Sequence, residues 1–176
     1  ITFRGEPLWP VSVTPRNVMV TASGAGATRC KLTSIGSGLA NVRCHDAVTG
    51  LPADSGFELG YTVAATAPDA PGGFAYAGTS SAASYTPSAT LAWSSSGGAR
   101  TAGETTWGGL STHHVTFAGL SSSRSHAHVT ALGSDGGYCK VLSWYNVGTD
   151  LRTNVRCFDA AGTARRAPFA LAYFHH

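Results

Sequence analysis

Charged residues are scarce in this sequence. Asp, Glu, Lys and Arg make up only 12% of the 176 residues, against about 25% in typical soluble domains. The net charge of +3 is small and the lysines and arginines are scattered, so no nucleic acid partner is predicted. No run of apolar residues approaches the roughly 18 that a membrane span needs, so no membrane span is predicted. With 43% hydrophobic residues, an intrinsically disordered tail is excluded.

The motifs of several enzyme classes are also missing. The chain contains no Gly-x-Ser-x-Gly nucleophile elbow, no His-Glu-x-x-His zinc motif, no P-loop and no Gly-x-Gly-x-x-Gly. Its nine carboxylates form no pair in matching strand positions, so glycoside hydrolysis by paired carboxylates has no support. We therefore predict no catalytic residue and no cofactor, and a non-catalytic protein is favoured over an enzyme.

A helical period is absent as well. Short blocks of four to eight residues alternate apolar and polar side chains instead, and Gly, Ser, Asp or Asn bounds each block. Val18, Val20 and Ala22 are expected to share one face of a strand, as are Cys139, Val141 and Ser143. The sequence predicts an all-β fold without significant helix: an antiparallel β-sandwich, immunoglobulin-like or jelly-roll-like, built from a duplicated unit.

The basis for that duplication is an internal repeat. The segment NVRCHDAVTG at 41–50 returns as NVRCFDAAGT at 154–163. Five matching blocks in the same order predict that one unit has been written twice. The four further pairs are ITFRG (1–5) with VTFAG (115–119), VMVTASG (18–24) with AHVTALG (127–133), CKLTSI (30–35) with CKVLSW (139–144), and FELGY (57–61) with FALAY (169–173).

The repeat divides the chain into a partial β-repeat unit at 1–65, a candidate linker at 66–73 and a complete unit at 74–174. Residues 74–114 predict two or three strands that the first unit lacks, because the chain opens at the strand matching residue 115. A half-sandwich exposes sheet edges. Three arrangements of the partial unit are expected. It packs on the second unit as one composite fold, or a neighbouring subunit completes it in a homo-oligomer or filament, or upstream residues have been lost.

The two ends of the sequence carry little information about function. The chain opens on Ile1 rather than Met, which predicts a removed leader or a fragment. The terminal His175 and His176 are either native or the end of a purification tag, so we assign them no function.

The four cysteines occupy equivalent repeat positions. Duplication favours the local disulfides Cys30–Cys44 and Cys139–Cys157, each contributing on the order of 3 kcal/mol. A zinc site of four cysteines is disfavoured, because the Cys-x₂₋₄-Cys spacing is missing. Paired cysteines in a chain rich in Gly, Ser and Thr predict an oxidising compartment, and hence a secreted, extracellular protein.

His126 and His128 carry the one metal hypothesis. Residues i and i+2 of a strand share a face, so both imidazoles could bind one ion. The segment loosely resembles the His-x-His strand of copper–zinc superoxide dismutases, but the further ligands of that family are missing downstream. His113 and His114 lie one strand upstream. We therefore predict no metal site, and a metal-dependent enzyme using His126 and His128 stays an alternative.

His45 and Asp46 have the residue types of a catalytic dyad. The second copy has Phe158 and Asp159 at these positions, so the histidine is replaceable. Each aspartate directly follows a predicted strand and precedes a glycine, which is typical of an Asx turn at a hairpin. We predict turn formation at both aspartates and no acid–base role.

Aromatic side chains offer a second alternative, a polysaccharide-binding module in which rings stack on sugars. Trp107 is the strongest candidate because it lies among glycines. Trp144 matches Ile35 in the first copy, which predicts a core or interface position. The other candidates are Trp9, Trp93, Tyr76, Tyr85 and Tyr145.

The pattern CKV-x-x-W at 139–144, NVRCFDAAG at 154–162 and F-x-L-x-Y at 169–173, preceded by HVTALGS and SYTPSA, resembles a tandem β-repeat of secreted actinobacterial proteins. The resemblance covers 74–174 as a full unit and 1–62 as a partial one, with His45 in place of the usual Phe. It implies secretion, disulfides and repeat architecture, without an established activity. We therefore expect a secreted, disulfide-stapled, non-catalytic protein for extracellular binding or assembly, in its sharper form a strand-sharing polymer or surface-layer subunit.

Overall fold

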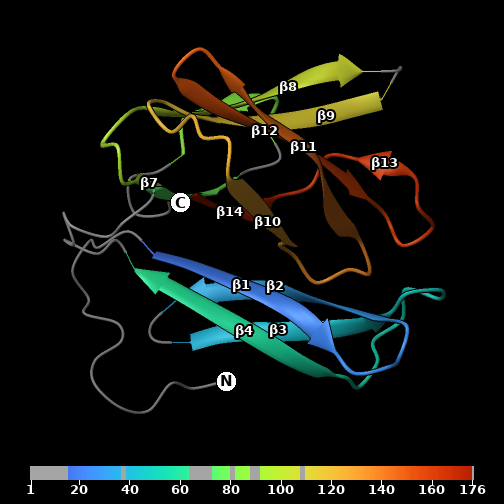
Figure 1. Cartoon of the computed structure of the whole chain (residues 1–176). Coiled ribbons are helices and arrows are strands. Elements are labelled where there is room, and N and C mark those ends of the chain that lie inside the picture. Colours follow the sequence, from blue (N-terminus) through green and yellow to red (C-terminus); the bar gives the residue numbers. More distant parts are fainter. Residues whose placement is uncertain are drawn as a thin grey trace.

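The computed structural model describes residues 16–36, 39–63, 73–79, 82–87, 92–107 and 110–175 (Figure 1). All regular elements in these ranges are strands and no helix occurs, which confirms the predicted all-β class. Two antiparallel sheets pack face to face in each half of the molecule, as in a β-sandwich. The predicted strand at 1–5, most of the predicted linker at 66–73, and His176 lie outside the described residues.

The N-terminal half, residues 16–63, contains four strands in two pairs. They are β1 (Arg16–Ser23), β2 (Thr28–Gly36), β3 (Leu39–Asp46) and β4 (Gly56–Val63). β1 pairs with β4 and β2 pairs with β3, both antiparallel. Apolar side chains at alternate positions fill the space between the two pairs, with Val18, Val20, Leu32 and Ala40 buried at its centre.

The C-terminal half, residues 73–175, is a larger sandwich. One sheet has the order β10-β14-β5-β7 and the other β11-β12-β9-β8-β6, with β13 beside β12. The core contains Phe117, Leu151, Val155, Phe169 and Tyr173, all fully buried. The strands are β5 (Gly73–Gly78), β6 (Ser84–Tyr85), β7 (Ala92–Ser94), β8 (Arg100–Trp107), β9 (Leu110–Phe117), β10 (Ser125–Ala131), β11 (Tyr138–Val147), β12 (Asp150–Phe158), β13 (Ala164–Arg165) and β14 (Phe169–His175).

The region upstream of β10 contains more strands than the two or three that its sequence predicts. Among the described residues four strands, β5 to β8, lie there, and the next, β9, contains the block predicted separately at 115–119. β6 and β7 are only two and three residues long, too short for a period of two to be read from the sequence.

The two cysteine-bearing hairpins have the same internal register. Cys30 lies opposite Cys44 in the β2–β3 hairpin, and Cys139 lies opposite Cys157 in the β11–β12 hairpin. Both pairs form disulfides, as predicted. A register shift follows each pair at the same place, between Leu32 and Ser34 and between Val141 and Ser143. The expectation that Ser143 shares a face with Cys139 and Val141 is therefore wrong, because an extra residue interrupts the alternation.

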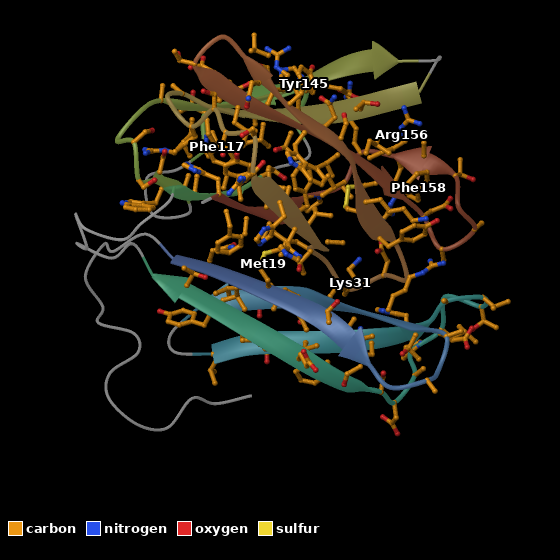
Figure 2. The ribbon with its side chains drawn as sticks, in the orientation of Figure 1. Met19, Lys31, Phe117, Tyr145, Arg156 and Phe158 are labelled. Atoms are coloured by element: carbon orange, nitrogen blue, oxygen red, sulfur yellow. A yellow bond between two sulfur atoms is a disulfide. The ribbon has the colours of Figure 1, made fainter. Side chains whose placement is uncertain are left out.

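The N-terminal half packs against the C-terminal half at β10, β14 and the loop that follows β10. The Thr130 hydroxyl accepts a hydrogen bond from the Val20 amide at 3.1 Å and donates to the Val20 carbonyl at 3.2 Å. The Gly133 amide donates to the Leu32 carbonyl at 2.9 Å. Met19 and Lys31 point from the N-terminal half toward this contact (Figure 2). Of the three arrangements expected for the partial unit, packing on the second unit is the one present in the described residues.

Candidate functional site

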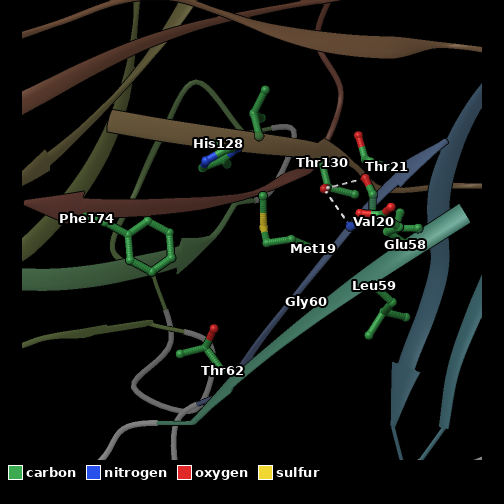
Figure 3. Close-up of a pocket in the computed structure, with 11 residues that line it drawn as sticks. Met19, Val20, Thr21, Glu58, Leu59, Gly60, Thr62, His128, Thr130 and Phe174 are labelled. Carbon is green, nitrogen blue, oxygen red and sulfur yellow. Dashed lines mark hydrogen bonds between the residues drawn. The ribbon is translucent and has the colours of Figure 1, made fainter. Parts of the chain in front are cut away.

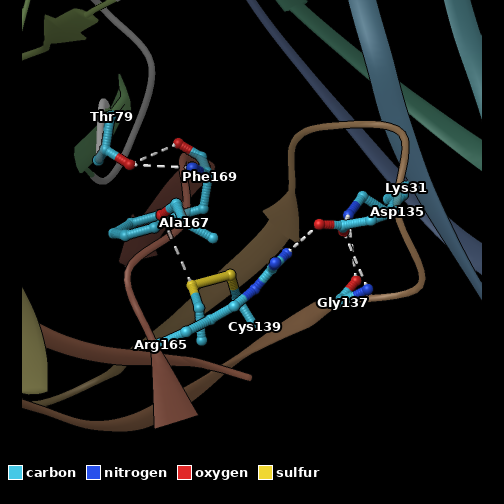
Figure 4. Close-up of a disulfide and its surroundings, with 9 residues drawn as sticks. Lys31, Thr79, Asp135, Gly137, Cys139, Arg165, Ala167 and Phe169 are labelled. Carbon is cyan, nitrogen blue, oxygen red and sulfur yellow. Dashed lines mark hydrogen bonds and ion pairs between the residues drawn. A yellow bond between two sulfur atoms is a disulfide. The ribbon is translucent and has the colours of Figure 1, made fainter. Parts of the chain in front are cut away.

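An ion-pair cluster around the buried Lys31 joins the two halves. Lys31 Nζ donates to Asp135 Oδ1 at 2.7 Å and to the Gly137 carbonyl at 3.2 Å, while Arg165 binds the second oxygen of Asp135 (Figure 4). Burial alone would raise the pKa of Asp135, but the hydrogen bonds from Lys31, Arg165 and the Gly137 amide outweigh it and hold that pKa well below its usual range. The carboxylate therefore stays ionised, and its partners make it a structural link between the halves.

His45 lies beside this cluster and is only 2% exposed. Burial lowers its pKa, and the positive charges of Lys31 and Arg43 lower it further, although a hydrogen bond to the backbone of Ser134 and the charge of Asp135 oppose the shift. A neutral, enclosed imidazole next to two cations belongs to the contact between the halves and does not form an accessible dyad with Asp46.

Both aspartates after the cysteine hairpins form the predicted turns. Asp46 Oδ1 accepts hydrogen bonds from the amides of Val48 at 2.9 Å and Thr49 at 2.7 Å. Asp159 Oδ1 accepts from the amide of Thr163 at 2.9 Å. The bond from Val48 is that of an Asx turn, whereas Asp159 binds the amide four residues on and its carbonyl accepts the Gly162 amide at 3.2 Å. Turns therefore form at both aspartates, as predicted, and only the first is of the Asx type.

A pocket of about 400 Å³ opens between the two halves (Figure 3). Outward-facing residues of β1 and β4, among them Met19, Glu58 and Gly60, form one wall. His128 of β10 and Phe174 of β14 form the other wall. The volume falls in the range of small-ligand sites, roughly 300–1,000 Å³. One carboxylate, one imidazole and one aromatic ring give the pocket a mixed polar and apolar lining.

The two histidines of the metal hypothesis lie side by side at this wall. The ring centroids of His126 and His128 are 5.2 Å apart, and the His126 ring stacks on Phe174 at 5.1 Å. They share a face of β10, as the alternation predicts. Across the ranges that the structure describes, no group of three or more His, Cys, Asp or Glu side chains is arranged to hold a metal ion. The pair thus gains no third ligand there, whether from His113, His114 or elsewhere.

The candidate aromatic platforms separate into different environments. Trp144 is 42% exposed, and its indole N–H donates to the Ser125 hydroxyl at 3.1 Å, so it does not lie in the core. The interface position, the other one expected from its match with Ile35, stays a prediction. Tyr145 beside it is 44% exposed. Trp93 is half-buried in β7. The whole of Trp9 and the side chains of Trp107, Tyr76 and Tyr85 lie outside the described part of the structure.

Two features with functional potential were not singled out by the sequence. One is the edge of β4 away from β1, with which no strand pairs in the ranges that the structure describes. The other is a set of basic side chains, Lys140, Arg152 and Arg156, on the outward face of β11 and β12. The sequence did carry a signal for the basic side chains: in the alternating segment 150–158, Arg152 and Arg156 are an even number of residues apart and therefore share a face. The sequence carried no signal for the outer edge of β4, because the topology decides which strands pair with each edge.

Among the described residues, no helix is long and apolar enough to cross a membrane. The two disulfides point to an oxidising, extracellular-type environment. Comparison with known proteins found no matching family model, no matching curated protein and no matching solved structure.

Proposed function

We propose that this chain is a secreted, disulfide-stabilised, non-catalytic β-repeat protein that assembles with further copies of itself through strand pairing at the edge of β4. One observation carries the proposal. β14 pairs with β10 on one side and with β5 on the other. β4 pairs with β1 in the register that β14 has with β10, but no strand pairs with its other edge in the described residues.

The backbone of β4 supports the proposal. The amide and carbonyl of Val20 bind Thr130 on the side of β1 away from β4, so Val20 and Leu59 are a non-hydrogen-bonded pair. The amide and carbonyl of Leu59, and by alternation those of Phe57, therefore point to the outer edge of β4. In β14 the residue that matches Phe57 is Phe169, whose carbonyl accepts the amide of Thr79 at 2.8 Å.

Edge strands usually carry features that prevent pairing with another chain, such as lysine, proline, a bulge or a short length. β7 is three residues long, and the edge strand β11 contains Lys140 and a register shift. β4 is eight residues long, pairs without a shift and contains neither lysine nor proline. Glu58 and Gly60 at its centre face the pocket between the halves, and at Phe57 and Leu59 no strand covers the outer edge in the described residues.

Secretion and repeat architecture rest on the disulfides and on the resemblance to tandem β-repeats of secreted actinobacterial proteins. An assembly outside the cell needs each subunit to be stable without chaperones. Two disulfides, each closing a short loop, contribute to that stability. The polysaccharide-binding alternative has a separate observation, the exposed aromatic and basic side chains of β11 and β12. The metal-dependent alternative has only the pair His126 and His128.

The assembly proposal predicts a concentration-dependent mass above the 18.0 kDa of one chain, measured by sedimentation velocity. Leu59→Pro removes an outward amide from the β4 edge and should return the mass to that of one chain. Leu59→Ala is the matched control, because it loses the same side-chain packing but keeps the amide and should still assemble. A wild-type chain that stays at 18.0 kDa at every concentration would contradict the proposal, as would equal masses for the two variants.

A further inference from the structure

The outward face of the β2–β3 hairpin has four basic side chains at its disulfide end. Ala40 of β3 faces the N-terminal core, so Arg43 and His45, an odd number of residues from it, face outward. Cross-strand pairing adds Lys31 opposite Arg43 and Arg29 opposite His45. Three cations and one titratable imidazole therefore share this face.

The loop between β10 and β11 covers this basic face from the C-terminal half. Lys31 Nζ donates to Asp135 at 2.7 Å, and Arg43 donates to the Ser134 carbonyl at 3.5 Å. The His45 ring is hydrogen-bonded to the backbone of the same Ser134. The basic face of the hairpin is thus part of the contact that docks the N-terminal half on the C-terminal half.

The contact around His45 is close. A Cβ atom at Gly136 would lie 2.5 Å from the Gly50 carbonyl oxygen, so the loop and the turn after β3 meet backbone to backbone. The Arg29 guanidinium lies 3.8 Å from the centre of the Tyr138 ring of the other half. His45 is 2% exposed in this setting. A charge on its ring would therefore be largely removed from water while the halves are docked.

The surroundings of His45 do not compensate such a charge. Its Nδ1 is buried without a hydrogen-bond partner among the described residues, so a proton there would be a donor without an acceptor. Burial is the largest cause of its lowered pKa, and Lys31 and Arg43 lower that pKa further. Asp135 opposes the shift, but its carboxylate already binds both Lys31 and Arg165 (Figure 4).

Other charged groups lie on the elements around the ring. The carboxylate of Asp46, the next residue, accepts the amides of Val48 and Thr49 in its own turn. The full set of charged neighbours consists of Arg29 and Lys31 of β2, Arg43 and Asp46 of β3, Asp54 beyond it, Asp135 of the loop, Lys140 of β11, Asp159 after β12 and Arg165 of β13.

The second copy of the repeat has no titratable group at this place. Phe158 has the position of His45, and Tyr138 has that of Arg29. The two rings of the second copy stack with centroids 5.1 Å apart. An uncharged aromatic ring thus satisfies this position of the hairpin, and the imidazole is specific to the copy that docks on the other half.

From this arrangement we propose that His45 makes the docking of the two halves dependent on pH. While the imidazole is neutral, the N-terminal half stays docked; when it is protonated, the contact opens and β1 to β4 are released as one unit. Release would free the amide and carbonyl of Val20, which Thr130 now binds, so the outer edge of β1 becomes available to another strand. The proposal does not rest on assembly at β4.

The test is residue-resolved amide hydrogen exchange by NMR on the intact disulfide-bonded chain at about pH 7.5 and 5.5. The amides of Val20 and Gly133 are the reporters, because they donate across the contact to Thr130 and to the Leu32 carbonyl. A histidine released to water titrates near 6.5, so protonation favours the open form about tenfold at the lower pH and hardly at the higher. Protection factors of both amides, which correct for the intrinsic exchange rate, should therefore fall about tenfold.

Two substitutions separate His45 from other causes. His45→Phe, the residue of the second copy, should limit the fall to less than about twofold, because it cannot be protonated. His113→Gln is the matched control: His113 is buried in the C-terminal half and stays enclosed on release, so the fall should persist. Should His45→Phe lose protection of both amides already at the higher pH, His45→Gln, a smaller neutral side chain with an amide donor, replaces it.

Amides of β12 show whether one half is released or the whole chain unfolds. They should keep their protection at both pH values, because β12 lies in the C-terminal core. The proposal would be overturned by an unchanged protection of Val20 and Gly133 in the wild type, by an equal fall in the wild type and the neutral variants of His45, or by an equal loss of protection in β12.

Discussion

His113 is a buried titratable side chain beside the C-terminal core. It is 4% exposed, its ring meets the ring of Phe169 edge-on at 5.8 Å, and its Nε2 has no hydrogen-bond partner among the described residues. Burial lowers its pKa; the charge of Glu104 opposes this effect, and that of Arg166 adds to it. The folded protein therefore keeps this imidazole neutral at pH values where an unfolded chain protonates it.

This predicts a loss of stability in mildly acidic solution. The unfolded histidine binds a proton as the pH falls through about 6.5, whereas the folded one does not, so the free energy of unfolding decreases below that pH. The shifted carboxylates act in the same direction only at lower pH, below about 4. Thermal unfolding of the wild type between about pH 7.5 and 5.5 should therefore show a falling midpoint, and His113→Gln should make the decline shallower. It should not abolish the decline, because burial lowers the pKa values of His45 and His114 as well. A parallel decline in the two proteins would contradict the assignment to His113.

Single residues were predictable from the sequence where local hydrogen bonding decides their place. Asp46 and Asp159 form the expected turns because each carboxylate binds amides within four residues. Trp144 lies outside the core, one of the two positions expected for it, because β11 is an edge strand and leaves the ring 42% exposed; its match with Ile35 says nothing about that edge position. The neighbours of a side chain across strands depend on topology, which the local pattern does not contain.

Among the elements, the two cysteine hairpins were the most predictable. The repeat placed each cysteine pair in facing strands, and the disulfides follow. The register shift after each pair was not predictable, because an inserted residue looks like any other residue in an alternating pattern. For the same reason Ser143 was assigned to the wrong face, although Cys139 and Val141 were placed correctly.

The two disulfides stabilise cores of different size, so their removal should have different effects on the strands. Cys30–Cys44 stabilises a half with four buried apolar residues in its core, whereas Cys139–Cys157 stabilises a core of 14. Replacing either pair with alanines should cost about 3 kcal/mol. We expect Cys30→Ala with Cys44→Ala to release β1 to β4 selectively.

Hydrogen exchange measures this difference. In the variant lacking Cys30–Cys44, amides of β1 to β4 should exchange faster while those of β9, β12 and β14 stay protected, because the larger core does not depend on this bridge. The variant lacking Cys139–Cys157 is the comparison, and it should weaken protection in the C-terminal sheets. Uniformly faster exchange throughout the first variant would mean that the two halves unfold as one unit.

At the scale of the whole molecule, the contact between the halves was the least predictable feature. The sequence offered packing of the partial unit on the complete one as one of three arrangements. The contacts that hold it join residues more than 100 positions apart, such as Lys31 with Asp135 and Val20 with Thr130. Lys31 looks like a surface residue in the sequence, yet it is 3% exposed. Its burial is possible because Asp135 and the Gly137 carbonyl receive its ammonium group.

Thr130 allows this contact to be tested with a control supplied by the repeat itself. Its hydroxyl binds both the amide and the carbonyl of Val20, so Thr130→Val keeps the shape of the side chain but leaves two buried backbone groups unpaired. The expected loss is about 1–3 kcal/mol in the free energy of unfolding, measured by urea denaturation. Thr21 is the equivalent residue of the first copy and is exposed, so Thr21→Val should change stability by less than about 0.5 kcal/mol. Equal effects of the two substitutions would contradict docking of the halves through Thr130, since only that threonine binds backbone across the contact.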